Sequence, residues 1–288
     1  VFFVSKVWER VMSVVFFIMA QIICEAFPIS SSGHVTLLEN LFRAVSFDAK
    51  EALDFFAHGP TAIIILIFFI KSWWPVLFRI FSHYSYRDSY KRLWKIIFKI
   101  IFFVSVSTVF ITAGLFFPLK KILQNYSLFK SPLFLFVGFV ITSVSLFSLY
   151  IKNRFYSDEY CEKWDFKKAI ILGFIQGTAW LIPGVSRLAT TYVAGRWLKL
   201  SPRRSFQISF LIQFFLIAAA GVKGFFDLSV SSYSFVLHDL NFWGSVVIAS
   251  VLAYAGLHFV WLAIKYKKIW WFGFYELIPA VLVFVLLK

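Results

Sequence analysis

Long apolar runs dominate this chain, and they decide what it can fold into. A helix needs ~20 residues to cross a bilayer, and six runs approach that length: Lys50–Ile70, Leu93–Phe117, Pro132–Tyr150, Pro202–Phe226, Phe242–Lys265 and Trp270–Leu287. Of the 288 residues, 60% are hydrophobic and 15% are charged, against roughly 45–50% and about 25% in soluble domains. The sequence therefore predicts an all-α polytopic membrane protein with a single membrane domain over residues 1–288. It excludes a disordered chain, a secreted disulfide scaffold and a cytosolic enzyme.

The net charge of +15 indicates membrane topology rather than nucleic-acid binding. Lys and Arg gather in short loops between the apolar runs, as the positive-inside rule describes. Four basic loops fall on one side of the predicted topology, which we assign to the cytoplasm, so both termini are expected outside. Cys24 lies in an apolar run and Cys161 in a basic loop, and we expect no disulfide between them.

Two further apolar helices are interrupted, and each interruption is followed by a short helix. Val4–Ala26 ends at Phe27-Pro28 and precedes Ser32–Arg43, while Phe166–Ile182 ends at Pro183-Gly184 and precedes Arg187–Leu198. At 1.5 Å per residue the short helices cannot cross a bilayer. Irregular backbone at membrane depth is tolerated only inside protein or beside a cavity. We therefore predict two re-entrant hairpins that build a site, with plain loops between ordinary spans as the alternative.

The two breaks share one spacing, which suggests an internal repeat. A glutamine, Gln21 or Gln176, stands seven residues before a proline, and a serine follows that proline by three. One short helix and three spans come after each break. We expect two inverted-topology repeats, 1–150 and 151–288, with the functional site near the bilayer midplane. The first run could also pass for a signal peptide, but Glu25 stands where a small cleavage-site residue should be.

Ionisable residues inside membrane segments are costly and mark functional sites. Glu25 lies deep in the first predicted hairpin, and Gln21, four residues earlier, shares its helix face. Their oxygens suit a hard divalent cation, Mg²⁺ or Ca²⁺. The alternative is a carboxyl group that a neighbouring helix merely satisfies.

The breaks themselves carry the groups that handle phosphate. The first reads Ser30-Ser31-Ser32-Gly33-His34, where a serine caps the helix, the free N–H groups attract anions and His34 can act as acid, base or orienting partner. The second contains Arg187, whose planar fork suits phosphate oxygens; an ion pair with Glu25 is a compatible alternative. These groups predict chemistry on a phosphate at membrane depth, in an amphiphilic substrate.

At these residues the chain resembles the bacterial undecaprenyl-diphosphate phosphatase family, BacA/UppP. That family has an (E/Q)xxxE motif followed by a Pro and an SS[TS]GH-type stretch, and a second motif, PGxSRSxxT. The matching segments are Gln21-Ile22-Ile23-Cys24-Glu25, Pro28-Ile29-Ser30-Ser31-Ser32-Gly33-His34 and Pro183-Gly184-Val185-Ser186-Arg187-Leu188-Ala189-Thr190-Thr191. Similarity continues through Phe56-Ala57-His58 and Phe274-Tyr275, so it covers nearly the whole chain.

The resemblance implies two inverted repeats with six full spans and two re-entrant hairpins. It implies hydrolysis of undecaprenyl diphosphate to undecaprenyl phosphate and phosphate, in the bacterial cytoplasmic (inner) membrane, at a site facing the extracytoplasmic side. This reaction recycles the carrier lipid for cell-wall synthesis and requires a divalent cation. The partners are then the lipid and the bilayer, without nucleic acid, and a homodimer is left open.

The resemblance also assigns roles to individual residues. Ser31 matches the nucleophile, His34 its catalytic partner, and Glu25 and Gln21 the acidic, metal-associated pair. Pyrophosphate binding is assigned to Arg187, Ser186 and Thr191, and to Ser30, Ser32 and Gly184 beside them. Three residues depart from the family pattern: an uncharged Gln21, Leu188 in place of the second Ser of PGxSRS, and Phe215 in place of a Pro.

Two other functions compete with this interpretation. The type-2 phosphatidic acid phosphatase family shares the Ser-Gly-His element, but its second motif requires a His and an Asp where this chain has Val193 and Trp197. A polyprenyl-phosphate transporter or flippase of the same fold, with or without hydrolase activity, explains the architecture equally well. A transporter without hydrolase activity does not explain a Ser-His pair beside an Arg. The residues also leave open whether Ser31 or water attacks the phosphorus.

Overall fold

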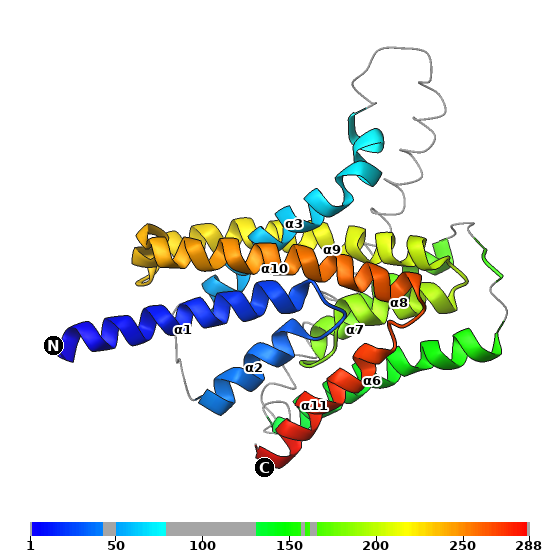
Figure 1. Ribbon diagram of the computed structural model, residues 1–288, viewed down its shortest axis with the longest axis horizontal. Helices are drawn as coiled ribbons and strands as arrows, with labels where there is room; N and C mark the ends of the chain where they lie inside the picture. Colours follow the sequence, from blue (N-terminus) through cyan, green and yellow to red (C-terminus); the bar gives the residue numbers. More distant parts are fainter. Residues whose placement is uncertain (1, 43–49, 79–130, 157–158, 162–165, 287–288) are drawn as a thin grey trace.

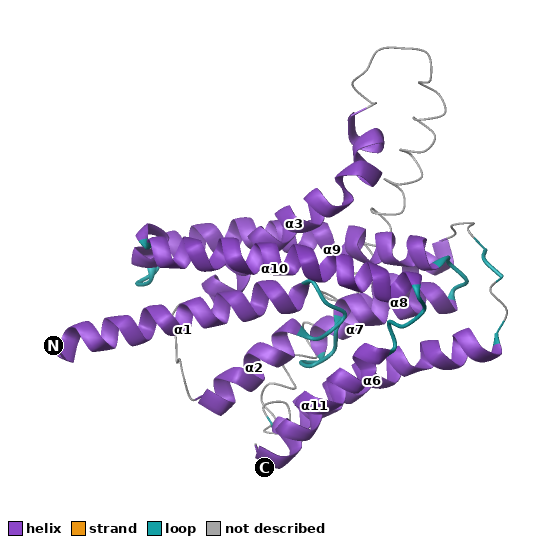
Figure 2. Ribbon diagram, in the orientation of Figure 1, coloured by secondary structure: helices purple, strands orange, loops and turns teal. Residues whose placement is uncertain are grey.

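The computed structural model describes residues 2–42, 50–78, 131–156, 159–161 and 166–286, and this part of the chain is helical apart from its turns (Figure 2). The predicted span Leu93–Phe117 and the basic loop before it lie outside the described residues. In chain order the helices are α1 (Phe2–Glu25), α2 (Ser31–Phe42), α3 (Lys50–Phe78), α6 (Pro132–Phe155), α7 (Phe166–Leu181), α8 (Arg187–Trp197), α9 (Pro202–Val230), the 3₁₀ helix η3 (Ser234–His238), α10 (Leu240–Lys265) and α11 (Trp271–Leu286).

Four of these helices are long and apolar enough to cross a membrane. They are α3 over Lys50–Ile70, α6, α9 and α10, and shorter apolar stretches occupy Met12–Glu25 of α1 and Trp271–Val285 of α11. The prediction of an all-helical polytopic membrane protein is confirmed at this level. The structure corrects three boundaries, because the helices predicted to end at Ile70, Tyr150 and Phe226 continue to Phe78, Phe155 and Val230. A charged residue such as Lys71 ends an apolar run. Lysine has a high helix propensity, however, so the helix continues through it.

The helix starts follow local capping chemistry. Ser201 accepts a hydrogen bond from the Arg204 N–H and places Pro202 in the first turn of α9. Proline is favoured there because its missing N–H would have no helical partner. Asp239 caps α10 in the same way, through the Asn241 N–H at 2.8 Å. These sites explain why α9 and α10 begin at the end of polar turns.

The helices form two groups that the interrupted hairpins join. Helices α3, α9 and α10 pack together, α6 packs against α11, and the pairs α1–α2 and α7–α8 lie between these groups (Figure 1). The α3–α9 contact is close enough for backbones to touch, since a Cβ on Gly221 would lie 2.4 Å from the Gly59 Cα. Small residues allow such close approach in membrane helix pairs. Gly59 and Gly221 therefore let α3 and α9 pack as a close pair.

Helix α6 supports the break between α7 and α8 through its backbone. Gly184 in that break has φ of +86°, a left-handed conformation that glycine adopts without steric cost. A Cβ on Gly138 of α6 would lie 1.9 Å from the Pro183 carbonyl oxygen. Glycine at position 138 therefore lets the second break sit directly on α6.

We expect Gly138→Ala to lower the free energy of unfolding by about 1–3 kcal/mol, the usual range for overpacking, because the new methyl group overlaps a backbone oxygen. Thermal unfolding of the purified protein in detergent measures this. Gly244→Ala is the matched control on α10, where a Cβ would meet nothing within 4 Å. Equal melting temperatures for the two variants would show that α6 and the break are not in contact as described.

Candidate functional site

A cavity of about 860 Å³ lies between the two breaks. Its lining includes side chains from both hairpins and from the long helices α3 and α9. The polar ones are Gln21, Glu25, Ser30, Ser31, Ser32, Asp54, His58, Gln176, Ser186, Arg187 and Gln213. Apolar side chains such as Phe27, Trp180 and Leu216 complete the wall. A cavity lined by both charged and apolar side chains suits a ligand with a charged head and a lipid tail.

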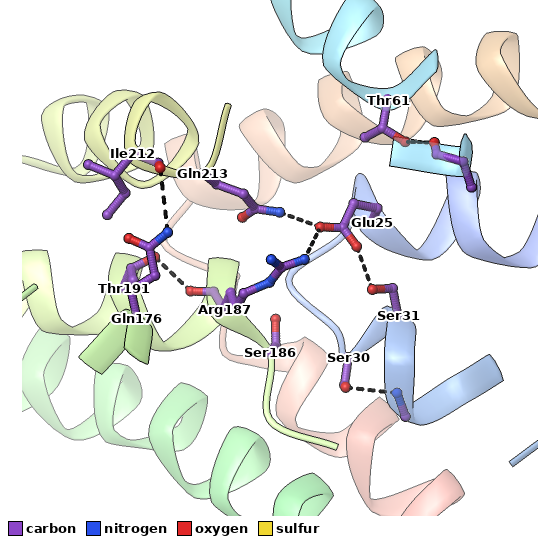
Figure 3. Close-up of polar contacts among 12 residues, drawn as sticks. Glu25, Ser30, Ser31, Thr61, Gln176, Ser186, Arg187, Thr191, Ile212 and Gln213 are labelled. Carbon is purple, nitrogen blue, oxygen red and sulfur yellow. Dashed lines mark hydrogen bonds and ion pairs between the residues drawn. The ribbon is translucent and has the colours of Figure 1, made fainter. Parts of the chain in front are cut away.

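Glu25 is the centre of the polar contacts (Figure 3). Its Oε1 accepts hydrogen bonds from Nη2 of Arg187, at 2.9 Å, and from the amide of Gln213. Its Oε2 accepts a hydrogen bond from the Ser31 hydroxyl. Only 3% of the Glu25 side chain is exposed, against 22% for Arg187. The last residue of α1 thus joins α2, α8 and α9, and its buried charge has a counter-charge, which buried carboxylates require.

The first break positions Ser31 as the first residue of α2. Ser30 is the N-cap, because its hydroxyl accepts a hydrogen bond from the Gly33 N–H at 3.1 Å. The Ser30 N–H in turn donates to Oε1 of Glu276, at 3.0 Å, from α11. Glu276 is fully buried. A carboxylate at a helix start is favourable, so Glu276 ties the start of α2 to α11.

The second break repeats this local structure with a shift in register. Ser186 caps α8 through the Ala189 N–H at 3.2 Å, so it corresponds to Ser30 and not to Ser31, the serine at the matching distance from the proline. Arg187 then corresponds to Ser31 as the first helical residue. Thr142 of α6 fixes the turn, since its hydroxyl donates to the Gly184 carbonyl and accepts from the Ser186 N–H. Both first helical residues reach the same carboxylate.

Three of the sequence-predicted site residues lie outside the cavity lining. Nδ1 of His34 is 2.6 Å from the Ser30 carbonyl oxygen, and its ring is parallel to that of Tyr275 with centroids 5.5 Å apart. The Thr191 hydroxyl donates to the Arg187 carbonyl at 2.7 Å, and Gly184 packs against α6. The structure therefore brings together Gln21, Glu25, Ser30, Ser31, Ser32, Ser186 and Arg187. Of the residues that depart from the pattern of the family resembled, Leu188 lines the cavity and Phe215 is exposed.

The oxygen atoms available for a divalent cation come mainly from amides. In the described part of the chain, Oε1 of Gln21, Gln176 and Gln213 is buried without a hydrogen-bond partner, and all three side chains line the cavity. No group of three or more His, Cys, Asp or Glu residues that could hold a metal occurs among the described residues. Mg²⁺ is often held by one or two carboxylates and by substrate phosphates. Glu25 and Gln21 fit that kind of site rather than a closed protein cage.

Sequence reasoning missed five polar residues of this region. Gln213 binds Glu25, and Gln176 lines the cavity from α7. Asp54 and His58 line the cavity from α3, and Glu276 holds the start of α2. Three of them are ionisable residues in apolar helices, the signal that singled out Glu25 and Arg187. Applied to every such residue, this rule would have found them. Gln213 carries no charge, and the sequence contains no comparable signal for it.

Comparison with known proteins identifies similar chains over almost the full length. The sequence model of the family described as "Bacitracin resistance protein BacA" matches residues 14–282. The undecaprenyl-diphosphatase 1 of Shouchella clausii is 24% identical over 271 residues, covering 93% of both chains. The undecaprenyl-diphosphatase of Borrelia hermsii is 27% identical, covering 96% of this chain and 99% of its own. That of Thermotoga maritima is 28% identical, covering 92% and 95%.

We expect Glu276→Leu to lower the free energy of unfolding by about 1–3 kcal/mol, the cost of a buried N–H left without an acceptor. Glu276→Gln keeps a carbonyl oxygen for the Ser30 N–H and should lose less. Thermal unfolding in detergent compares the two variants. If Glu276→Leu proved as stable as Glu276→Gln, the hydrogen bond between α11 and α2 would have no role in holding the break.

Proposed function

This chain belongs to the bacitracin resistance protein BacA family, and from that membership and the geometry of its site we propose that it is a membrane undecaprenyl diphosphate phosphatase. The relatives reported above, which match it over 93–99% of their length, are named undecaprenyl-diphosphatases. The reaction is hydrolysis of the lipid diphosphate to undecaprenyl phosphate and inorganic phosphate. The four long apolar helices and a cavity lined by both charged and apolar side chains are consistent with a lipid substrate.

One observation carries the proposal. Ser31 and Arg187 are the first residues of two separate short helices, and both bind Glu25 at the wall of one cavity. The proposed nucleophile and the guanidinium thus both contact one carboxylate. A diphosphate that enters the cavity can replace Glu25 as the hydrogen-bond acceptor of Arg187. An arginine binds phosphate oxygens through two parallel N–H donors.

The two helix starts add to the binding of anions. Ser31 and Ser32 of α2, and Arg187 and Leu188 of α8, line the cavity. The N–H groups in the first turn of a helix have no partner within the helix, and the helix dipole favours negative charge there. Two such starts beside Arg187 offer compensation for the charge of a diphosphate. We assign Ser30, Ser186, Thr191 and Gly184 to shaping these starts.

Ser31 is the proposed nucleophile and Glu25 the group that takes its proton. The hydroxyl already donates to Oε2 of Glu25, the geometry that a nucleophile and its base require. His34 is assigned an orienting role, because its Nδ1 lies against the carbonyl of Ser30, the residue before Ser31. Direct attack by water, with Ser31 binding phosphate, is the second form of the same proposal.

A divalent cation, Mg²⁺ or Ca²⁺, is proposed as the cofactor. Glu25 and Gln21 would hold it together with phosphate oxygens of the substrate, and it would neutralise charge on the phosphoryl group. Because Gln21 carries no charge, the protein ligands alone would bind the cation with low affinity. The free amide oxygen of Gln176, the residue that the repeat pairs with Gln21, lies in the same cavity.

The membrane arrangement is part of the proposal. Two inverted repeats, 1–150 and 151–288, would each contribute one re-entrant hairpin, α1–α2 and α7–α8. Two capped breaks that meet at Glu25 and Arg187 support this arrangement. We assign the protein to the bacterial cytoplasmic membrane, which its bacterial relatives support, and we propose that the site opens to the extracytoplasmic side, opposite the basic loops.

We expect purified protein in detergent to release inorganic phosphate from undecaprenyl diphosphate, and EDTA to abolish the release. Arg187→Gln should lose turnover, and it should also lose stability by up to about 3–5 kcal/mol, since the buried Glu25 carboxylate is left without its counter-charge. The double variant Glu25→Gln/Arg187→Gln removes both charges. It should recover stability without recovering turnover.

These measurements separate the competing functions. A well-folded wild type that binds the lipid diphosphate without releasing phosphate would indicate a transporter. Normal turnover in the double variant would show that the ion pair has only a structural role, and normal turnover in Ser31→Ala would exclude the covalent route.

We expect Gln21→Glu to lower the Mg²⁺ concentration for half-maximal activity about tenfold, because the number of ligand charges tunes cation affinity. Gln21→Leu, of similar volume, should raise that concentration. Mg²⁺ titration of phosphate release and of the melting temperature gives two independent readouts. Unchanged titrations in both variants would remove Gln21 from the cation site.

A further inference from the structure

We propose that His58 of α3 is the general base that activates water in this site, an inference that rests on the proposed phosphatase function. Whether Ser31 or water opens the diphosphate, a water molecule attacks phosphorus once in every turnover. In direct hydrolysis it attacks the lipid diphosphate, and in the covalent route it attacks phosphorylated Ser31. Either attack requires a group that accepts the proton of the water molecule.

Glu25 is poorly suited to that role. Both of its oxygens are already engaged by protein donors, which are Ser31, Gln213 and Arg187. Its contact with Ser31 also directs it to the hydroxyl rather than to a water molecule.

His34 has the right chemistry but a different location. Its ring is enclosed by Tyr275 and by Phe139, with an edge contact of 5.3 Å between centroids to the latter. Its Nδ1 is occupied by the Ser30 carbonyl. Since His34 does not line the cavity in the described structure, its imidazole does not face the phosphate that Arg187 and Ser31 would bind.

His58 meets both requirements. It lines the cavity together with Glu25, Ser31 and Arg187, and its side chain is only 7% exposed. Its Nδ1 is buried and has no hydrogen-bond partner among the described residues. An unpaired buried nitrogen costs free energy, so its presence beside the charged groups of the site points to a ligand or water molecule that completes it.

Asp54 provides the electrostatic support for this imidazole. It lies four residues before His58, on the same face of α3, and it also lines the cavity. The charged groups that interact electrostatically with His58 are Glu25, Arg187 and Asp54. Glu25 and Asp54 stabilise the imidazolium that forms when His58 accepts a proton, whereas the positive charge of Arg187 opposes it.

The reaction step balances without any further reactant. The water oxygen forms a bond to phosphorus while its proton passes to His58. The bond from phosphorus to the leaving oxygen breaks, and the electron pair stays on that oxygen. The leaving oxygen is the bridging oxygen of the lipid diphosphate in direct hydrolysis, or Oγ of Ser31 in the covalent route. His58 then returns the proton to the leaving oxygen, which restores the neutral imidazole.

The test uses phosphate release from undecaprenyl diphosphate by the purified full-length protein. His58→Gln should lower kcat about 100-fold or more, the range for loss of a general base, and should change KM less than about threefold. His34→Gln should lose less activity. His258→Gln is the matched control, because His258 is exposed on α10 away from the cavity and should keep wild-type kcat.

Two further measurements distinguish proton transfer from a structural role. Added imidazole should restore part of the kcat of His58→Ala, which a purely structural defect would not allow. Asp54→Asn, at a half-buried position, should fold and should lower kcat about tenfold, by weaker stabilisation of the imidazolium. If substitutions at position 58 unfold the protein, the kcat of Asp54→Asn tests the role of His58 instead.

Wild-type kcat in His58→Gln, or a loss in His58→Ala that imidazole does not relieve, would overturn the inference while leaving the phosphatase function intact. Absence of phosphate release by the wild type would instead overturn the proposed function, and the role of His58 with it.

Discussion

The buried ion pair between Glu25 and Arg187 is the contact on which the rest of this structure depends. A carboxylate in an apolar bundle is stable only beside a counter-charge and hydrogen-bond donors. Glu25 finds them on three other helices, α2, α8 and α9. The pair therefore joins the two halves of the chain at one point, and that point is the wall of the cavity. The same contact can stabilise the empty site and open to an anionic substrate, because phosphate oxygens can replace the carboxylate at the guanidinium.

Capping explains how polar groups come to face a cavity in so apolar a chain. Each break leaves backbone N–H groups without helical partners, and Ser30 and Ser186 satisfy one of them at each helix start. Residues of other helices form further hydrogen bonds with the two turns. Glu276 binds the first break and Thr142 binds the second. The remaining N–H groups at the two helix starts are the ones that an anion would bind. The breaks that begin α2 and α8 therefore also form an anion-binding site.

The sequence predicted the class of fold, the positions of both breaks and most of the residues around Glu25. These depend on local signals: apolar length, proline and glycine interruptions, and charges in apolar segments. It did not predict that Gln213 binds Glu25 or that His58 rather than His34 faces the cavity. Those facts depend on how α3 and α9 pack against the hairpins, and such packing leaves no mark in the neighbouring residues. The one-residue shift between the breaks, which pairs Ser186 with Ser30, was hidden for a related reason. Distance from a proline does not determine which serine becomes the cap.

The glycine contact between α3 and α9 has a consequence for how a bulky lipid reaches the site. His58 immediately precedes Gly59, whose Cα would touch any Cβ placed on Gly221. Two backbones this close interlock and cannot slide past each other without a clash. The side of the cavity formed by α3 and α9 is therefore a fixed wall that keeps His58 and Gln213 in register. A bulky lipid therefore reaches Glu25, Ser31 and Arg187 from a side of the cavity other than the one that α3 and α9 form.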